Sequence, residues 1–566
     1  MDFTRRVWPW ASVLVAVLLL NGSLTFHNVW PTLGVHWPGE ISAEFAALLL
    51  ILAMTNARFG ATPRRAITAL SALFVLLALG RYAEVTAPAL YGRDVNLYWD
   101  LPNITSVVEM LVRVASWWAI AGVCLGAVAA LTMMYCIARW SISRIDAVLR
   151  ERRARIAFGV VGAVLVACFA MQQTSDAIPT VPRFSIPVSK TYSLQVAKVL
   201  ETFSGSRSVR NLPPSPQLRS SLAELGGSDV LLVFEESYGS VTYDRPEFRQ
   251  ALAPARARLA LAIKDTGRDV VSAFATSPTF GGVSWLAHIS FLSGIEVRDP
   301  DRYALLMTQK RRTIASLFKN AGYRAVAVMP GLRQTWPEGS FYGFDQIYDF
   351  NDLNYHGPEF GWWRIPDQFS LAQLDSREIQ PAARKPLFVF FPTVSTHMPF
   401  RPTPPVQSDW QRVLTSRPFD PAPLHQSLTQ TPEWTNMGKS YTDAVQYFFD
   451  TVSTYLRARA GEKFVLIILG DHQPAANVSG EGAPWDVPIH VITHNPEILA
   501  SLRRQGFTAG LDPARPVIGK MNELSPLLLA AFDRPASEGI RLSRASSAEL
   551  APGGGSRVAK SAELAR

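Results

Sequence analysis

The chain has 566 residues, a formal net charge of +9 and only three cysteines. A chain of this length is too long for one small domain. Its mean hydropathy of +0.10 is unusual for a soluble enzyme of this size, because apolar residues crowd into about the first 170 positions. The three cysteines, Cys124, Cys136 and Cys168, fall in the same part, which excludes a cysteine nucleophile or a zinc–thiolate site in the remainder.

Five apolar segments in this first part predict membrane-spanning helices. They are residues 7–26, 41–57, 66–82, 107–137 and 156–170. Each approaches the ~20 residues needed to cross a bilayer, and their low charge favours spans over buried helices of a soluble domain. The first segment is not a cleavable signal peptide, because no small-residue cleavage pattern follows it and four more apolar segments do.

Arginines lie in alternate loops between these segments and predict the orientation of the chain. One set lies before the first segment and around the loops after the second and fourth: Arg5, Arg6, Arg58, Arg64, Arg65, Arg139, Arg144, Arg150, Arg152, Arg153 and Arg155. The other loops have no basic residue over 28–40 and only Arg93 over 83–103. Basic loops face the cytoplasm, so five spans put the rest of the chain on the outer face. The charge of +9 is partly this topological signal and does not indicate a nucleic-acid partner.

The chain divides into four parts by composition. Residues 1–171 are the predicted five-span anchor, and the Pro- and Ser-rich residues 172–227 are a linker with one helix over 190–203. Residues 228–534 form the outer domain. Residues 535–566 are rich in Ser, Ala, Gly and Arg and form a tail that we expect to be disordered.

The outer domain alternates strands with amphipathic helices. This pattern predicts an α/β fold with a mostly parallel sheet flanked by helices. The predicted strands are 230–234, 270–275, 324–328, 387–391, 464–469 and 489–493, and the predicted helices are 246–264, 313–320, 437–460 and 497–504. His490 lies inside the last strand and is predicted to be packed rather than catalytic.

Two of these strands end in side chains that bind metal ions. Residues 229–236 read DVLLVFEE and residues 464–472 read FVLIILGDH. Continuous apolar runs of this length are typical of buried parallel strands, and the chemistry of an open α/β sheet lies just past the carboxyl ends of its strands. One such end is often a surface turn, whereas two of them favour a divalent-cation site. Side chains alternate along a strand, so only one of Glu235 and Glu236 should face the site.

A serine at a helix start is the third informative feature. Gly281 and Gly282 lead into Ser284, and an amphipathic run then stops at Gly294. A hydroxyl in this position lies near exposed backbone N–H groups and the positive end of the helix dipole. Ser284 is therefore either an activated nucleophile or an N-cap residue.

These motifs together resemble the alkaline phosphatase superfamily, in its branch of membrane-bound sulfatase-like phosphotransferases. That branch includes lipoteichoic acid synthases, phosphoethanolamine transferases and the phosphoglycerol transferases of periplasmic glucans. The matching positions are Glu236 after the first strand, Ser284 followed by Ser293-Gly294, the Asp471-His472 pair, and the S-T-H-M-P-F motif that contains His397. With the five-span anchor, the resemblance extends to about Phe532.

The resemblance implies a metal site and a reaction. Glu236, Asp471 and His472 would hold one divalent cation, Zn²⁺ or Mn²⁺, with Ser284 as a further ligand and the nucleophile; a second metal is left open. His397 would bind the phosphate or assist the leaving group. Arg333 and Trp336 would contact the substrate, on a looser match.

The reaction implied is transfer of a phosphoglycerol or phosphoethanolamine headgroup from a membrane phospholipid. The group would pass through a serine-linked intermediate to an envelope glycan or lipid acceptor. We expect a monomer in a bacterial inner membrane, with the catalytic domain in the periplasm and no nucleic-acid partner.

Two departures from the family pattern affect this assignment. The nucleophile of the lipid-headgroup transferases is usually threonine, whereas position 284 is serine. Formylglycine sulfatases need proline and arginine two and four residues after the nucleophile, where this chain has Leu286 and His288. This favours phosphorus chemistry over sulfate-ester hydrolysis. The alternatives are a hydrolase, either a phosphodiesterase or an atypical sulfatase, and a non-catalytic protein that binds envelope glycan or lipid.

Overall fold

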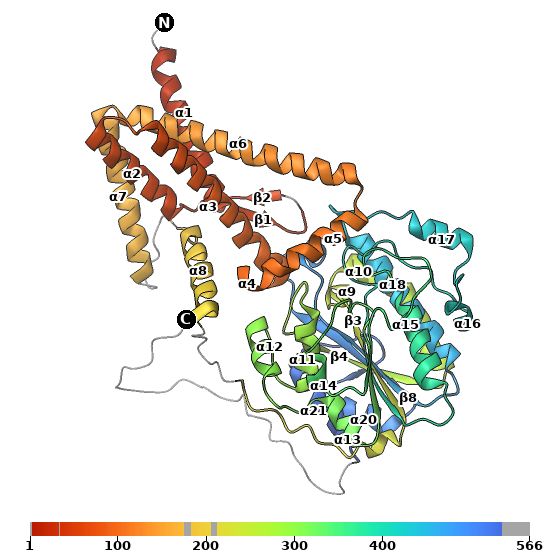
Figure 1. Cartoon of the computed structure of the whole chain (residues 1–566). Helices are drawn as coiled ribbons and strands as arrows, with labels where there is room; N and C mark the ends of the chain where they lie inside the picture. The colour runs from red at the N-terminus through yellow and green to blue at the C-terminus, as the bar shows by residue number, and fades with distance from the viewer. Residues whose placement is uncertain (1–2, 33, 175–182, 205–211, 535–566) are drawn as a thin grey trace, which may run out of the picture.

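The computed structural model describes residues 3–32, 34–174, 183–204 and 212–534, and shows a group of long helices beside an α/β domain (Figure 1). The predicted tail over 535–566 lies outside the described residues, as do parts of the predicted linker. Within that linker, α8 (Val188–Ser204) covers the predicted helix.

Five long helices overlap the five predicted apolar segments. They are α1 (Phe3–Thr25), α2 (Ala43–Phe59), α3 (Arg64–Tyr91), α6 (Trp117–Leu149) and α7 (Arg152–Thr174). Among the described residues, α3, α6 and α7 are long and apolar enough to cross a membrane, and the apolar stretch Trp10–Thr25 is shorter. The chain is therefore an integral membrane protein with three candidate spans, and the number five stays a prediction.

The predicted span over 107–137 is wrong at both ends. A separate helix, α5 (Ile104–Val114), covers its first part, and α6 begins only at Trp117. Glu109 and Arg113 make α5 amphipathic, and Ser116 has an extended backbone that starts the next helix. At the other end α6 continues to Leu149 and includes part of the predicted basic loop. Hydropathy averaged over the apolar segment does not reveal the break between α5 and α6.

The outer domain is built on an eight-stranded sheet of the order β10-β4-β9-β8-β3-β7-β5-β6. The strands are β3 (Asp229–Glu235), β4 (Asp269–Thr276), β5 (Arg324–Val328), β6 (Gln346–Tyr348), β7 (Leu387–Pro392), β8 (Phe464–Gly470), β9 (Asp486–Thr493) and β10 (Thr508–Ala509). Strands β8, β3, β7, β5 and β6 are parallel neighbours, whereas β9 and β10 run against theirs. The predicted α/β class and all six predicted strands are confirmed.

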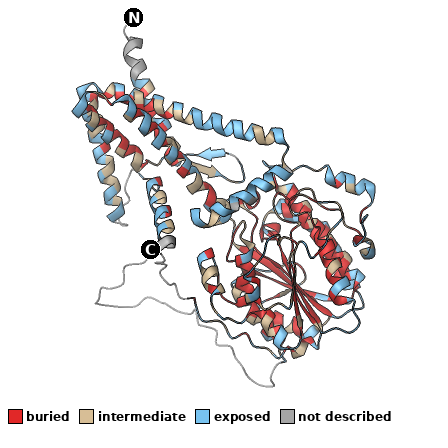
Figure 2. Cartoon of the chain, in the orientation of Figure 1, coloured by how far each residue is buried: buried red, intermediate tan, exposed pale blue. Residues whose placement is uncertain are grey.

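Helices cover both faces of this sheet. Val230, Leu232 and Phe234 of β3 pack on one face, with α11 (Ser284–Ser293), α13 (Ile314–Asn320), α20 (Pro496–Arg504) and α21 (Met521–Ala531). Leu231 and Val233 pack on the other, with α10 (Pro246–Asp265), α15 (Asp367–Leu374) and α18 (Gly438–Ala458). Every residue of β3 is buried (Figure 2), which explains why its sequence is apolar from Val230 to Phe234.

His490 is a packed residue of β9, in agreement with its predicted role. Its ring is buried, with Nε2 3.0 Å from the Tyr238 hydroxyl and Nδ1 2.6 Å from the Ser272 hydroxyl. Burial lowers the pKa of His490 to about 3, with a smaller contribution from the nearby Arg256. The imidazole is therefore neutral in the folded protein.

The His490→Gln variant should lose less stability in acid than the parent chain. Below pH 6.5 the unfolded chain binds a proton that folded His490 excludes, so the free energy of unfolding falls as the pH falls towards 3. From pH 7 to 5 this contribution is about 2 kcal/mol, and the variant should lack it. Denaturant titrations at both pH values measure the difference. The exposed His425→Gln serves as control, and equal acid losses in all three proteins would contradict the assignment.

Candidate metal and nucleophile site

The parallel pairing of β3 with β8 brings the predicted ligands to one edge of the sheet. Glu235 is opposite Gly470 in the register. Glu236, which directly follows β3, therefore lies beside Asp471 and His472, which directly follow β8. The side chain of Glu235 points elsewhere and accepts a hydrogen bond from the Thr393 hydroxyl at 3.0 Å. Of the two adjacent glutamates, the geometry therefore favours Glu236 as the ligand.

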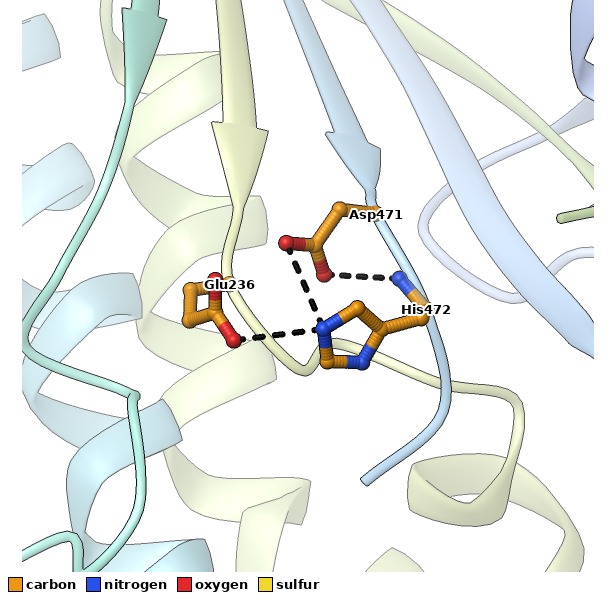
Figure 3. A group of neighbouring side chains, drawn as sticks. All are labelled: Glu236, Asp471 and His472. Carbon is orange, nitrogen blue, oxygen red and sulfur yellow. Dashed lines mark hydrogen bonds and ion pairs between the residues drawn. The ribbon is translucent and has the colours of Figure 1, made fainter. Parts of the chain in front are cut away.

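Glu236, Asp471 and His472 converge on one point (Figure 3). His472 Nε2 lies 3.3 Å from Glu236 Oε1 and 3.8 Å from Asp471 Oδ2. One ligand atom from each side chain lies within 4.8 Å of the others, and all three residues are buried. Two carboxylates and an imidazole at this spacing can hold one divalent cation.

Ser284 completes this group from the start of α11. Its hydroxyl donates to Glu236 Oε2 at 2.7 Å and lies 3.2 Å from His472 Nε2. The N-cap position belongs to Val283, which makes no side-chain capping bond, so the interpretation of Ser284 as an N-cap is wrong. Val283 has φ +63°, which is costly for a β-branched residue. Strained backbone of this kind is typical of functional sites.

The electrostatics of the site favour a bound cation. Burial raises the pKa of Asp471, and the charge of Glu236 raises it further. Burial also opposes ionisation of Glu236, but His472 outweighs it and holds the pKa of Glu236 well below its usual range. Burial lowers the pKa of His472, yet the two carboxylates raise it to about 9. The concentrated negative charge is balanced either by a proton on His472 or by a metal ion.

The individual atoms also fit a metal ion. Within the described part of the chain, Asp471 Oδ2 is buried without a hydrogen-bond partner, while Oδ1 accepts from the backbone N–H groups of Ser237 and His472. His472 Nδ1 donates to the Gln473 carbonyl at 2.8 Å, which leaves the Nε2 lone pair facing the other ligands. This set of oxygen and nitrogen donors suits Zn²⁺ or Mn²⁺.

His397, Glu236 and Ser284 line the same cavity. This cavity has a volume of about 680 Å³. Its ring packs against Trp363 at 4.7 Å, and its Nδ1 lies 2.7 Å from the Met398 carbonyl. The structure thus brings five of the seven predicted site residues together. Their chemical roles stay predictions.

Arg333 and Trp336 are not brought into this group. Neither belongs to the described lining of the cavity. Arg333 lies over the ring of Trp362 at 4.3 Å and donates to its carbonyl, and Trp336 packs against Tyr342 at 4.7 Å. Both are packing residues in the structure, and their predicted substrate contacts stay untested.

Sequence reasoning missed two groups of residues around the cavity. The first is His288, one helical turn after Ser284. Its side chain is buried, its Nε2 has no hydrogen-bond partner among the described residues, and burial lowers its pKa to about 3. The second comes from the membrane part of the chain: Ala87, Tyr91, Arg93, Asp94, Val95, Asp100, Ile104 and Val107. The sequence signal for the second group was Arg93, the one basic residue over positions 83–103.

A comparison with protein families matches residues 295–504 to the Sulfatase family. This match confirms the predicted resemblance to the sulfatase-like branch of the alkaline phosphatase superfamily. It covers the domain from the end of α11 to α20, including His397, Asp471 and His472. Comparison with curated protein sequences gave no match.

Several solved structures are similar to part of this chain. The lipoteichoic acid synthase LtaP from Listeria monocytogenes is 13% identical, with 52% of this chain and 71% of that one covered and a TM-score of 0.33. The zinc complex of the C-terminal periplasmic domain of EcEptC from Escherichia coli is 18% identical, with 56% and 84% covered and a TM-score of 0.35. The phosphoglycerol transferase GacH from Streptococcus pyogenes, with sn-glycerol-1-phosphate, is 11% identical, with 57% and 95% covered and a TM-score of 0.33. Since these scores are low, the α/β architecture rests on the strand order and helix layers described above.

Proposed function

We propose that this chain, which carries a sulfatase-family segment, transfers a phosphoglycerol or phosphoethanolamine group from a membrane phospholipid to an envelope glycan or lipid. The observation that carries the proposal is the hydroxyl of Ser284, 2.7 Å from Glu236 and 3.2 Å from His472. It opens onto a cavity that is walled partly by the membrane segment. A nucleophile placed there meets a phosphodiester that is borne by a lipid.

The reaction has two displacements at phosphorus. Ser284 loses its hydroxyl proton to solvent and its Oγ attacks the phosphorus of the donor. The P–O bond to diacylglycerol breaks, and the departing oxygen takes a proton from His397. An acceptor hydroxyl then gives its proton to His397 and attacks the same phosphorus. The bond to Ser284 Oγ breaks and the serine oxygen regains a proton from solvent. A divalent cation held by Glu236, Asp471 and His472 would lower the pKa of the hydroxyl and offset the charge of the phosphoryl oxygens.

His397 is the proposed proton carrier for the departing alcohol. Its Nδ1 is engaged by the Met398 carbonyl at 2.7 Å, so Nε2 is the nitrogen that can exchange a proton. Its position in the lining of the cavity supports this role, because a substrate bound there would lie beside the imidazole. His288 is a poorer candidate because burial lowers its pKa to about 3.

Hydrolysis of a phosphodiester or of a sulfate ester is the second candidate function. The family match to sulfatases favours it. Against sulfate esters, Leu286 and His288 occupy the positions where formylglycine conversion needs proline and arginine. We therefore give priority to phosphorus chemistry with the unmodified serine, at the periplasmic face of a bacterial inner membrane.

Purified full-length protein with labelled phospholipids distinguishes these functions. The donors are phosphatidylglycerol and phosphatidylethanolamine in mixed micelles with Zn²⁺ or Mn²⁺, with and without extracted envelope glycans. Release of diacylglycerol together with label on an acceptor supports transfer. Release with label only in water-soluble phosphate esters indicates a hydrolase. Absence of turnover of these lipids and of an aryl sulfate, with metal bound, would contradict both enzymatic functions.

A further inference from the structure

The outer end of membrane helix α3 packs directly on the loop that leads to Ser284. A Cβ atom at Gly281 of this loop would overlap the carbonyl oxygen of Leu90 in α3. On the other side of the contact, a Cβ at Gly92 would lie 2.7 Å from the Cβ of Phe280 and 2.5 Å from the ring of Trp485. Each partner thus has a glycine where the two backbones approach, and a larger residue at either position forces them apart.

Backbone conformation alone does not account for the two glycines. Gly281 and Gly92 have φ of 67° and 63°, which by itself favours glycine. However, Gly267 and Gly60 have φ of 69° and 76°, and a Cβ added at either would have no other atom within 4 Å. Gly60 ends α2 as Gly92 ends α3, each donating to the carbonyl four residues earlier. The close contact is therefore a separate feature of Gly281 and Gly92.

The loop under α3 is bonded to the segment that carries the metal ligands. The Gly281 N–H donates to the Gln473 carbonyl at 3.0 Å, and the same carbonyl accepts from His472 Nδ1 at 2.8 Å. Phe280 pairs with Gln473 as an isolated bridge. A displacement of Phe280 and Gly281 therefore moves the turn before Ser284 and also the carbonyl that orients His472.

Two more contacts fix the membrane segment around the cavity. Trp99 Nε1 donates to Asp301 Oδ1 at 3.2 Å, and the guanidinium of Arg113 lies 5.9 Å from the ring centre of Trp362. Together with the α3 contact they join the membrane segment to the outer domain at three places near the cavity that holds Ser284.

We infer that Leu90–Gly92 at the end of α3 positions the nucleophile loop over residues 280–283. The membrane segment is then needed for the geometry of the site, because the position of the Ser284 hydroxyl and the orientation of the His472 ring depend on the contact with α3. None of these α3 residues is assigned a role in the chemistry. The activity part of the test rests on the proposed function, whereas the metal-binding part does not.

The test compares Gly92→Ala with Gly60→Ala in the full-length protein in detergent. Both variants place a side chain at a left-handed helix cap, but only Gly92→Ala meets the outer domain. We expect Gly92→Ala to weaken Zn²⁺ affinity about 10-fold, measured by chelator competition, through the displaced carbonyl that orients His472. Its kcat on a water-soluble phosphodiester should fall about 100-fold, with KM changed less than ~3-fold, because the nucleophile is misplaced. Gly60→Ala should have the same Zn²⁺ affinity, kcat and KM as the parent chain.

The outcomes separate the inference from the proposed function. Equal Zn²⁺ affinity and kcat in both variants would overturn the inference. A rise of KM alone would overturn it too, because it would make the segment a substrate contact. If the parent chain turns over no ester but Gly92→Ala still weakens Zn²⁺ binding, the proposed function fails and the inference stands. If Gly92→Ala does not fold, Gly281→Ala is compared with Gly267→Ala instead. Gly281→Ala adds a side chain to the same contact from the outer domain, and the expected results are the same.

Discussion

The Ser284→Ala variant should lose turnover by roughly 10⁴-fold or more while it still binds the metal. The hydroxyl is the one group that forms and breaks the bond to phosphorus in the proposed reaction. The three buried side chains Glu236, Asp471 and His472 remain in place without it, so Zn²⁺ affinity should change by less than about 10-fold. Initial rates of diacylglycerol release and chelator competition measure the two quantities.

The matched control for this variant is Ser284→Thr. It keeps a hydroxyl at the start of α11, and threonine is the residue that the resembling transferases usually have there. Its activity should remain well above that of the alanine variant. Turnover by Ser284→Ala at the parental rate would contradict a covalent mechanism and would leave direct attack by water or by the acceptor.

The Glu236→Gln variant should weaken Zn²⁺ binding by about 10²- to 10³-fold, because it removes one of the ligands that hold the ion. His472 holds the pKa of Glu236 well below its usual range, so the parent residue is a carboxylate. The amide removes its negative charge and one ligand oxygen. Turnover should fall at least in proportion at limiting metal.

Glu235→Gln is the matched control one residue earlier. Burial raises the pKa of Glu235 well above its ordinary value, and the nearby Asp367 raises it further. An amide therefore replaces a group that already favours its neutral form, and Zn²⁺ affinity should change by less than ~3-fold. A larger loss of affinity in Glu235→Gln than in Glu236→Gln would show that the wrong glutamate has been assigned.

The centre of the site could be predicted because the central strands have strong local signals. Strands β3 and β8 are buried on both faces, so their sequences are continuously apolar and end abruptly at Glu236 and Asp471. Parallel pairing then brings the two ends together without further information. The alternation of side chains along β3 also predicted that only one of the two glutamates faces the site. The hydrogen bond between Glu235 and Thr393 agrees with this prediction.

Other features depend on contacts between distant parts of the chain. The edge strands β6 (Gln346–Tyr348) and β10 (Thr508–Ala509) are too short for a periodic pattern. The separation of α5 from α6 arises within one apolar stretch that averages as a single span. The approach of Gly92 to Phe280 joins residues on two domains, and each glycine alone has the appearance of an ordinary turn. Tertiary packing sets these features, and local sequence does not encode them.

Mass spectrometry of the peptide that contains Ser284 tests the central claim most directly. The full-length protein is mixed briefly with phospholipid donor and Zn²⁺ or Mn²⁺, then quenched in acid and digested. We predict a phosphoethanolamine or phosphoglycerol adduct on Ser284 that forms as diacylglycerol is released and disappears when the acceptor is added. Release of diacylglycerol with Ser284 unmodified at every time point, or an adduct on a different residue, would contradict the account.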